Sequence, residues 1–107
     1  MRFHRNFEWN AAKAARNAAK HGVSFQDAAT ALADEHADLF HLERYDRAHS
    51  RNEDRYLTLA SDPENRFIVY CIAWTKRTVA DGLLTRIISA RMATRTERKW
   101  YERYVTK

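Results

Sequence analysis

The sequence predicts an α+β fold in which helices pack on a small antiparallel sheet. Two helix-forming segments come first, three or four strand-like segments follow with short polar connections, and one more helix closes the chain. The chain has 107 residues, of which 45% are hydrophobic, so we expect a single domain over 1–107 with one core. Only two glycines are present, and a Gly-rich phosphate loop is therefore excluded.

The first third of the chain predicts a short strand and two helices. Aromatic residues at alternate positions favour a strand over 3–9. Asn10 is a good N-cap for a helix over 11–20, and Gly22 is a typical residue to end it. A second helix is expected over 24–34, beginning at a capping serine. The link is only about three residues long, as in an αα-hairpin.

The middle of the chain predicts the first strands of the sheet. Residues 39–42 contain enough apolar side chains for a short strand, and residues 43–54 read as a polar loop. A strand is expected over 55–61, followed by a turn at 62–65 with proline in its favoured position. Residues 66–75 are apolar at both odd and even positions, which is typical of a central strand.

The last third of the chain predicts one strand and one helix. Residues 76–82 are expected to form a polar connection, and residues 83–90 the next strand. The pattern Thr-x-x-Glu at the start of 94–104 is a capping box that opens a C-terminal helix. Trp100 and Tyr104 are four residues apart, so we expect both to be buried in the core.

Basic residues are unevenly distributed along the chain. The net charge is +5, and 14 of the 19 basic residues are arginine, the better bidentate phosphate ligand. Residues 1–24 carry five basic and one acidic residue, and residues 65–107 carry ten and three. Residues 25–64 carry four basic and ten acidic residues. Two basic ends around an acidic middle suggest one basic face for an anionic partner.

Several classes of protein are excluded by the sequence. No apolar run approaches the length of a membrane span, and the first ten residues are not a signal sequence, so we expect a cytoplasmic protein. The single cysteine, Cys71, reads as a small buried hydrophobe and excludes an internal disulfide. Histidines at 36, 41 and 49 have no familiar ligand spacing, and we expect neither a metal nor a cofactor.

The arginines near the last two strands are the most informative residues. Arg86 lies within an apolar strand, where a charge costs stability unless it is solvated or paired. Strand alternation puts Arg86 and Arg91 on opposite faces unless a bulge intervenes. The alternative interpretation of Arg86 is structural, as an ion pair with an acidic residue of 34–64. The charges of the last helix, including Arg95, fit a solvated face.

Two further groups of residues have both a functional and a structural interpretation. His21, beside Lys20 at a helix end, is suited to proton transfer, but its position alone favours capping of the last carbonyls. Aromatic rings near the arginines, Tyr56, Tyr70 and Trp74, suit stacking with single-stranded RNA bases or simple burial in the core.

Several segments share their wording and order with one known family. They are FEWN at 7–10, KHGVSFQDA at 20–28, EDRYLTLA at 53–60, RIISARMATRTER at 86–98 and WYER at 100–103. Over residues 7–104 the chain resembles BrnT, the toxin of a bacterial type II toxin–antitoxin pair. It differs from that pattern at Asn10, where the family usually has Asp, and at Lys76, where it usually has Glu.

The resemblance implies a fold, an activity and partners. BrnT-like proteins have a fold similar to RelE-type ribonuclease toxins, and they inhibit translation by cutting RNA without a metal. A small ribbon-helix-helix antitoxin, BrnA, holds them inactive, and promoter DNA is bound only through that antitoxin. The basic surface would then serve RNA in the free toxin and the antitoxin in the complex.

The resemblance also assigns roles to individual residues. It implies that three arginines bind the phosphate and stabilise the transition state: Arg77, Arg86 and Arg91. His21 is the weaker acid–base candidate. Three more basic residues are expected to bind RNA: Lys20, Lys76 and Arg95. The residue that acts as general base is left open.

Two other functions fit the same residues. The first is a basic module that binds RNA or ribosomes and blocks translation without cleavage. The second is a non-catalytic partner whose basic face exists to be covered by the antitoxin. Growth and RNA integrity on expression of the arginine variants separate the three interpretations.

Overall fold

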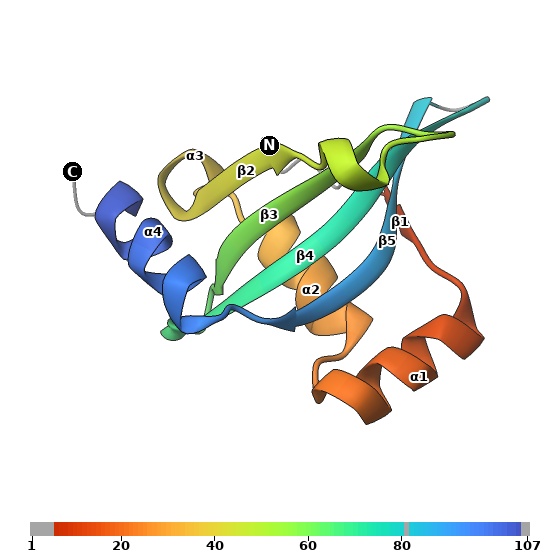
Figure 1. The fold of residues 1–107 in the computed structure, drawn as a ribbon. Helices are drawn as coiled ribbons and strands as arrows, with labels where there is room; N and C mark the ends of the chain where they lie inside the picture. Colours follow the sequence, from red (N-terminus) through yellow and green to blue (C-terminus); the bar gives the residue numbers. More distant parts are fainter. Residues whose placement is uncertain (1–5, 81, 106–107) are drawn as a thin grey trace.

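A computed structural model describes residues 6–80 and 82–105 and shows one five-stranded sheet with helices on both faces (Figure 1). The strands lie in the order β1-β5-β4-β3-β2. The strands are β1 (Asn6–Glu8), β2 (His41–Tyr45), β3 (Arg55–Asp62), β4 (Asn65–Val79) and β5 (Gly82–Met92). The helices are α1 (Ala11–His21), α2 (Phe25–Leu32), α3 (Ala37–Phe40) and α4 (Arg95–Val105), with a 3-10 turn at Arg47–His49.

The predicted α+β class, the paired N-terminal helices and the C-terminal helix are all confirmed. The Asn10 side chain accepts a hydrogen bond from the Lys13 amide at 3.0 Å, and Ser24 caps α2 in the same way. Gly22 ends α1 with φ of 70°, the left-handed conformation that favours glycine. The first strand, predicted over 3–9, corresponds to β1 at Asn6–Glu8, and its residues 3–5 lie outside the described residues.

The sheet is an antiparallel meander with one parallel edge strand. β2 to β5 pair in sequence order as predicted, whereas β1 runs parallel to β5 over Asn6–Glu8. The predicted polar connection over 76–82 is wrong, because β4 continues to Val79 and turns directly into β5. Alternating cross-strand pairs extend this hairpin beyond the apolar run from which the strand was predicted.

The segment before β3 is more regular than the sequence predicts. Leu39 and Phe40 belong to α3 rather than to a strand, and His41 and Leu42 begin β2. The predicted loop over 43–54 begins as the second half of β2. Short elements of this kind are decided by pairing with a neighbour, here β3, more than by local pattern.

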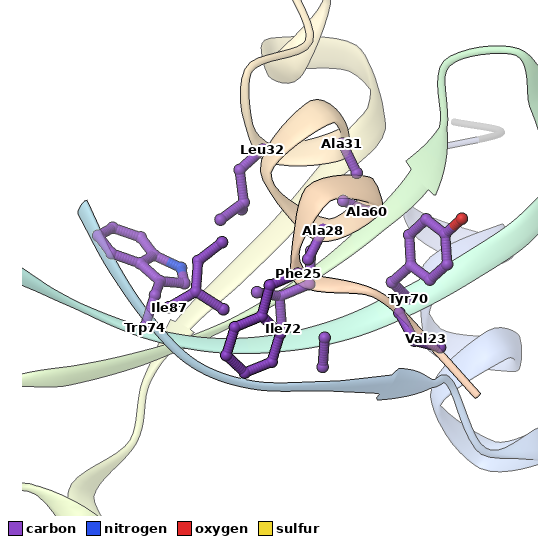
Figure 2. Packing of buried hydrophobic residues seen from close by; sticks show 11 residues of the cluster. Val23, Phe25, Ala28, Ala31, Leu32, Ala60, Tyr70, Ile72, Trp74 and Ile87 are labelled. Carbon is purple, nitrogen blue, oxygen red and sulfur yellow. The ribbon is translucent and has the colours of Figure 1, made fainter. Parts of the chain in front are cut away.

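The main core lies between the sheet and the first two helices. Phe25, Ala28 and Leu32 of α2 pack on Ile72 and Trp74 of the central strand (Figure 2). All five of these side chains are buried. The even-numbered residues of β4 therefore face α1 and α2, and the odd-numbered residues face the other side of the sheet, which we call the open face.

A smaller core lies on the open face beneath α4. Tyr101 packs there with Leu59, Val69 and Cys71, so the predicted burial of Cys71 is confirmed. The predicted burial of Trp100 and Tyr104 is wrong, since they are 49% and 41% exposed. The buried stripe of α4 is rotated by one residue, because Tyr101 places its hydroxyl 2.9 Å from the Phe40 carbonyl oxygen.

The outer edge of β5 is closed by a side chain of α1. Asn17 donates a hydrogen bond from Nδ2 to the Ala90 carbonyl at 2.7 Å, and its Oδ1 accepts one from the Ala90 amide at 3.1 Å. The same Nδ2 also donates to the Val23 carbonyl. A buried amide thus replaces the strand that would otherwise pair with Ala90, and it fixes α1 at this edge.

Candidate functional site

A change of register brings Arg86 and Arg91 to the same face of the sheet. Ala73 pairs with Ser89, but the next residue of β4, Trp74, pairs with Ile87, so β5 carries one extra residue there. Arg86 consequently lies opposite Thr75, and Arg91 lies opposite Cys71, both odd-numbered residues of β4. A β-bulge reverses the alternation of side chains along one strand. This is the bulge without which Arg86 and Arg91 would lie on opposite faces.

Four residues form a row across the open face. Arg55 of β3 pairs with Thr75 of β4, Thr75 pairs with Arg86 of β5, and Arg86 pairs with Glu8 of β1. Residues that pair directly across strands point to the same face, so two guanidinium groups and a carboxylate share one strip of the surface. Arg77 lies two residues further along β4 on the same face.

The carboxylate of Glu8 links two of these arginines. Arg77 donates to Glu8 Oε1 at 2.6 Å, and the nearest guanidinium nitrogen of Arg86 lies 3.8 Å from the same oxygen. The structural interpretation of Arg86 placed its partner within 34–64, and that position is wrong, because the partner comes from the first strand. The Glu8, Arg77 and Arg86 side chains remain 29%, 47% and 33% exposed, so a ligand can reach all three.

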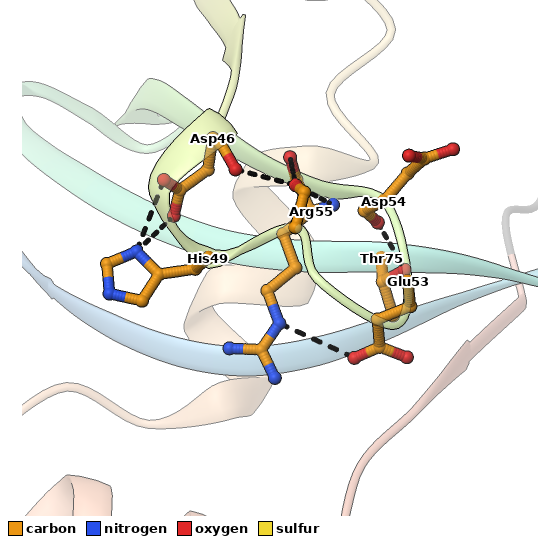
Figure 3. A network of polar contacts seen from close by, with 7 residues as sticks. Asp46, His49, Glu53, Asp54, Arg55 and Thr75 are labelled. Carbon is orange, nitrogen blue, oxygen red and sulfur yellow. Dashed lines mark hydrogen bonds and ion pairs between the residues drawn. The ribbon is translucent and has the colours of Figure 1, made fainter.

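Arg55 closes the other end of the row with an incompletely used guanidinium group. Figure 3 shows the bend before β3, where Arg55 Nε lies 3.5 Å from a carboxylate oxygen of Glu53. That distance makes an ion pair, yet Nε is buried and has no hydrogen-bond acceptor. Thr75 beneath it donates to the Asp54 carbonyl at 2.5 Å, which ties the bend to the sheet. The Arg55 side chain as a whole is 34% exposed, so its guanidinium group can bind an anion on this strip through its other nitrogens.

Arg91 lies at the far end of the face and forms a bidentate ion pair with Glu97. Its two terminal nitrogens lie 2.7 and 3.0 Å from the two carboxylate oxygens. Thr94 completes the predicted capping box, which is confirmed, by exchanging backbone and side-chain hydrogen bonds with Glu97. The Arg91 guanidinium and the Thr94 amide lower the pKa of Glu97 to about 2. Arg91 therefore orients α4, and its charge is compensated by a carboxylate more fully than the charge of Arg86.

A second row of paired residues and a pocket beside it separate the two ends of the open face. Arg44, Leu57, Ala73 and Ser89 pair in a second row across β2 to β5. Next to it is a pocket of about 180 Å³. Its lining residues are Leu42, Arg44, Leu57, Leu59, Cys71, Glu97 and Trp100. Burial raises the pKa of the Cys71 thiol to about 11, so this cysteine stays protonated and is a poor nucleophile.

We call this surface the arginine face and define it by the guanidinium groups that share it. They are Arg44, Arg55, Arg77, Arg86 and Arg91. The arginines come from four different strands or their ends, and Glu8 and Glu97 are the carboxylates paired with them on the sheet and on α4. The basic face expected from the charge distribution is thus built mainly from β-strand side chains rather than from the last helix.

The other predicted site residues lie away from this face. Lys76 points to the opposite side of β4, where its ammonium lies 5.4 Å from the Tyr56 ring centre and 5.9 Å from that of Trp74. His21 and Lys20 end α1, which packs at the β5 edge beside α2. Arg95 is exposed at the first turn of α4. The structure therefore brings Arg77 and Arg86 together and leaves His21 elsewhere.

Two residues of the site were not expected from the sequence. Glu8 lies in the FEWN segment and Arg55 in EDRYLTLA. Both segments carry the family resemblance, but it assigned no role to either residue. Their position depends on pairing between strands that are far apart in the chain, and no local pattern reports it. The alternation of Phe7 and Trp9 toward the core was the one available signal, because it places Glu8 on the other face.

The described ranges hold neither a metal-binding cluster nor a membrane-spanning helix. Across residues 6–80 and 82–105 no three His, Cys, Asp or Glu side chains form a group that could hold a metal ion. In the same part of the chain, no helix is both long and apolar enough to span a membrane.

Comparison with known proteins identifies the family of this fold and site. The model of a family described as the ribonuclease toxin BrnT, of type II toxin–antitoxin systems, matches residues 9–97. No curated protein sequence matches the chain. The matched range includes Arg55, Arg77, Arg86 and Arg91, while Glu8 lies one residue before it.

Proposed function

The chain belongs to the BrnT family of ribonuclease toxins, and on that premise we propose that it cleaves RNA on the arginine face. The row formed by Arg55, Thr75, Arg86 and Glu8 is the observation that carries the proposal. It offers two guanidinium groups and a carboxylate on one strip of sheet, and all three side chains are partly exposed. Cleavage of RNA needs a proton acceptor and donors that stabilise charge beside one phosphodiester, and these groups can supply both.

The arginines supply charge stabilisation in the proposed reaction. Attack on phosphorus builds negative charge on the non-bridging oxygens, and preorganised donors on a rigid sheet stabilise that charge without reorganising. Arg77 and Arg86 bind the reacting phosphate, and Arg55 binds the next phosphate along the RNA chain. Arg91 positions α4 and lies at the edge of the RNA path. Because arginine donors take the electrostatic role, the reaction proceeds without a metal ion.

The same face is proposed to bind the antitoxin. Type II toxins are neutralised by a protein partner, which we take to be a ribbon-helix-helix protein that carries the contact with promoter DNA. The pocket beside the half-exposed Trp100 provides an apolar anchor point, and Arg44 and Glu97, the ion-pair partner of Arg91, also line it. An acidic segment with one apolar side chain would fit there and cover the arginines. Free toxin then cleaves RNA and inhibits translation.

Expression without antitoxin tests the proposal. Wild type is expected to stop growth and fragment cellular RNA, whereas Arg86→Ala is expected to do neither at equal protein level. Arg16→Ala is the matched control, because it removes the same charge from an exposed position on α1. The control should remain fully toxic.

Each possible outcome selects among the functions. Toxicity with intact RNA would establish a binding module that blocks translation without cutting. Absence of toxicity in wild type would leave only the role of an antitoxin-binding partner. Cleavage that survives Arg86→Ala would keep the ribonuclease activity and reject the site.

A further inference from the structure

We propose that Glu8 is the general base that removes the proton from the ribose 2′-hydroxyl during RNA cleavage. The inference rests on the proposed ribonuclease function and names the residue that activates the nucleophile. It arises from the position of Glu8 on β1, between two arginines of the arginine face. A general base must lie within hydrogen-bond reach of the proton it takes, close to the groups that bind the phosphate.

The contacts of Glu8 leave part of its carboxylate available. Arg77 and Arg86 both approach Oε1, at 2.6 and 3.8 Å, and within the described residues Oε2 has no hydrogen-bond donor. The side chain is 29% exposed, so a ribose hydroxyl can reach it. Each guanidinium group has five N–H donors, and the contact with Glu8 uses one of them on Arg77. Within the described part of the chain the other donors of these two groups have no hydrogen-bond acceptor, so they can bind phosphate oxygens beside the carboxylate.

Other carboxylates near this face are less suited to the role. Both oxygens of Glu97 are held by Arg91, and one also accepts from the Thr94 amide, so this carboxylate is already engaged as the cap and anchor of α4. Glu53 has one arginine contact, at 3.5 Å to Arg55 Nε, and it lies on a bend rather than on the sheet. Glu8 is the carboxylate that contacts two arginines and lies in a strand.

The reaction balances with groups that the proposal names. Glu8 takes the proton of the 2′-hydroxyl, and the freed oxygen lone pair forms a bond to the adjacent phosphorus. The bond between phosphorus and the 5′ oxygen breaks, and its electron pair goes to that oxygen, which takes a proton from water. Glu8 then returns its proton to the hydroxide so formed. The products are a 2′,3′-cyclic phosphate and a 5′-hydroxyl end.

Single-turnover cleavage of a short labelled RNA by the purified full chain tests the role. For wild type the rate should rise with pH, because a general base acts only in its deprotonated form. Glu8→Gln still accepts a hydrogen bond from Arg77 but cannot take a proton, so its rate should fall by about 10²- to 10⁴-fold. The pH-dependent rise should also disappear. Glu102→Gln, which removes a carboxylate from a position on α4 that is 60% exposed, is the matched control and should keep both the rate and the pH profile.

Binding is measured separately with an RNA that carries a 2′-deoxyribose at the cleavage site. Glu8→Gln should bind this analogue within about threefold of wild type, because the arginines remain in place. Circular dichroism and the urea midpoint establish that the variant is folded. Glu8→Asp should be more active than Glu8→Gln, since it keeps a carboxylate, although at a longer distance from the ribose.

The outcomes separate failure of this inference from failure of the proposed function. A wild-type chain that does not cleave RNA overturns both. Cleavage by Glu8→Gln at the wild-type rate overturns the role of Glu8 alone. A slower variant that keeps the pH-dependent rise makes Glu8 a positioning residue for Arg77 and overturns its role as base. A wild-type product with a 3′-hydroxyl end overturns the 2′-hydroxyl mechanism.

Discussion

Arg86 and Arg91 point to the same face of the sheet although they are five residues apart on one strand. The extra residue of β5 between its pairs with Ala73 and Trp74 reverses the alternation, so that Arg86 lies over Thr75 and Arg91 over Cys71. At a rise of about 3.3 Å per residue, the two positions on β4 are about 13 Å apart. The two arginines therefore belong to one surface and serve different contacts on it.

Arg77 and Arg86 are expected to act as a unit, because both contact the Glu8 carboxylate. Each alanine variant should lower the single-turnover cleavage rate by about 10²- to 10³-fold, as for the loss of one aimed donor. The double variant should lose less than the product of the two effects. Measured rates for the wild type, both single variants and the double variant complete the cycle. Strictly multiplicative effects would show that the two groups act independently.

The Arg91–Glu97 ion pair is expected to make stability depend on acid. Its guanidinium lowers the pKa of Glu97 from 4.5 to about 2, so the ion pair contributes fully above about pH 4.5. The contribution is lost as the pH falls through about 2. Glu97→Gln should cost about 1–2 kcal/mol at neutral pH, allowing for the partial exposure of Arg91.

Urea unfolding at a series of pH values measures this dependence. The difference between wild type and Glu97→Gln should shrink toward zero as the pH falls toward the pKa of Glu97, about 2. Glu102→Gln is the control, because it lies on the same helix at 60% exposure. A constant difference across the series would mean that the ion pair does not set the acid response.

Asn17 is expected to be among the most costly side chains to remove. Its amide makes three hydrogen bonds, two of them to the unpaired edge of β5 at Ala90. Asn17→Leu leaves buried backbone groups without partners, which should cost about 2–4 kcal/mol. Arg16→Ala, beside it on the exposed side of α1, should stay within about 0.5 kcal/mol of wild type. Urea midpoints of the two variants give the comparison.

Trp100 is expected to matter for partner binding and little for folding. Its ring is 49% exposed beside the apolar pocket of the arginine face. Trp100→Ala should change stability by less than about 0.5 kcal/mol and weaken binding of the cognate antitoxin by about tenfold or more. Phe67→Ala is the matched control, since Phe67 is 85% exposed and lies outside that pocket. Calorimetric titration of the wild type and of both variants with antitoxin measures the three affinities. Equal affinities would place the antitoxin elsewhere.

Cleavage is expected to be insensitive to chelation. Because guanidinium donors carry the charge stabilisation, excess EDTA should leave the rate within about twofold of its value in magnesium buffer. The control is the same RNA with each additive and no protein. A large loss of rate on chelation, restored by adding a divalent cation, would reject the metal-independent mechanism.

Local signals in the sequence were strong enough to locate most elements. Asn10, Gly22, Ser24 and the Thr94–Glu97 pair each satisfy backbone groups within one helical turn, so their effect is readable from neighbours in the chain. The central strand was recognisable from its apolar run, but its true end at Val79 was not, because cross-strand pairing extends it.

The helix faces were predicted less well than the helices themselves. Spacing alone made Trp100 and Tyr104 the expected buried pair, whereas Tyr101 is the buried aromatic of α4. An aromatic stripe at i and i+4 has neighbours at i+1 that are equally able to face a core, and the Phe40 carbonyl selects Tyr101 here.

The sequence by itself determined the family and the α+β class, and it singled out Arg77, Arg86 and Arg91 as candidate site residues, because these depend on residue types and on short-range order. Tertiary structure alone decided which charged groups meet. Glu8 and Arg77 are 69 positions apart, and strand pairing joins them at 2.6 Å. The register change near Ile87 likewise turns Arg91 to the face of Arg86. Register is fixed by the whole sheet packing on its core, so no local stretch of the chain encodes it.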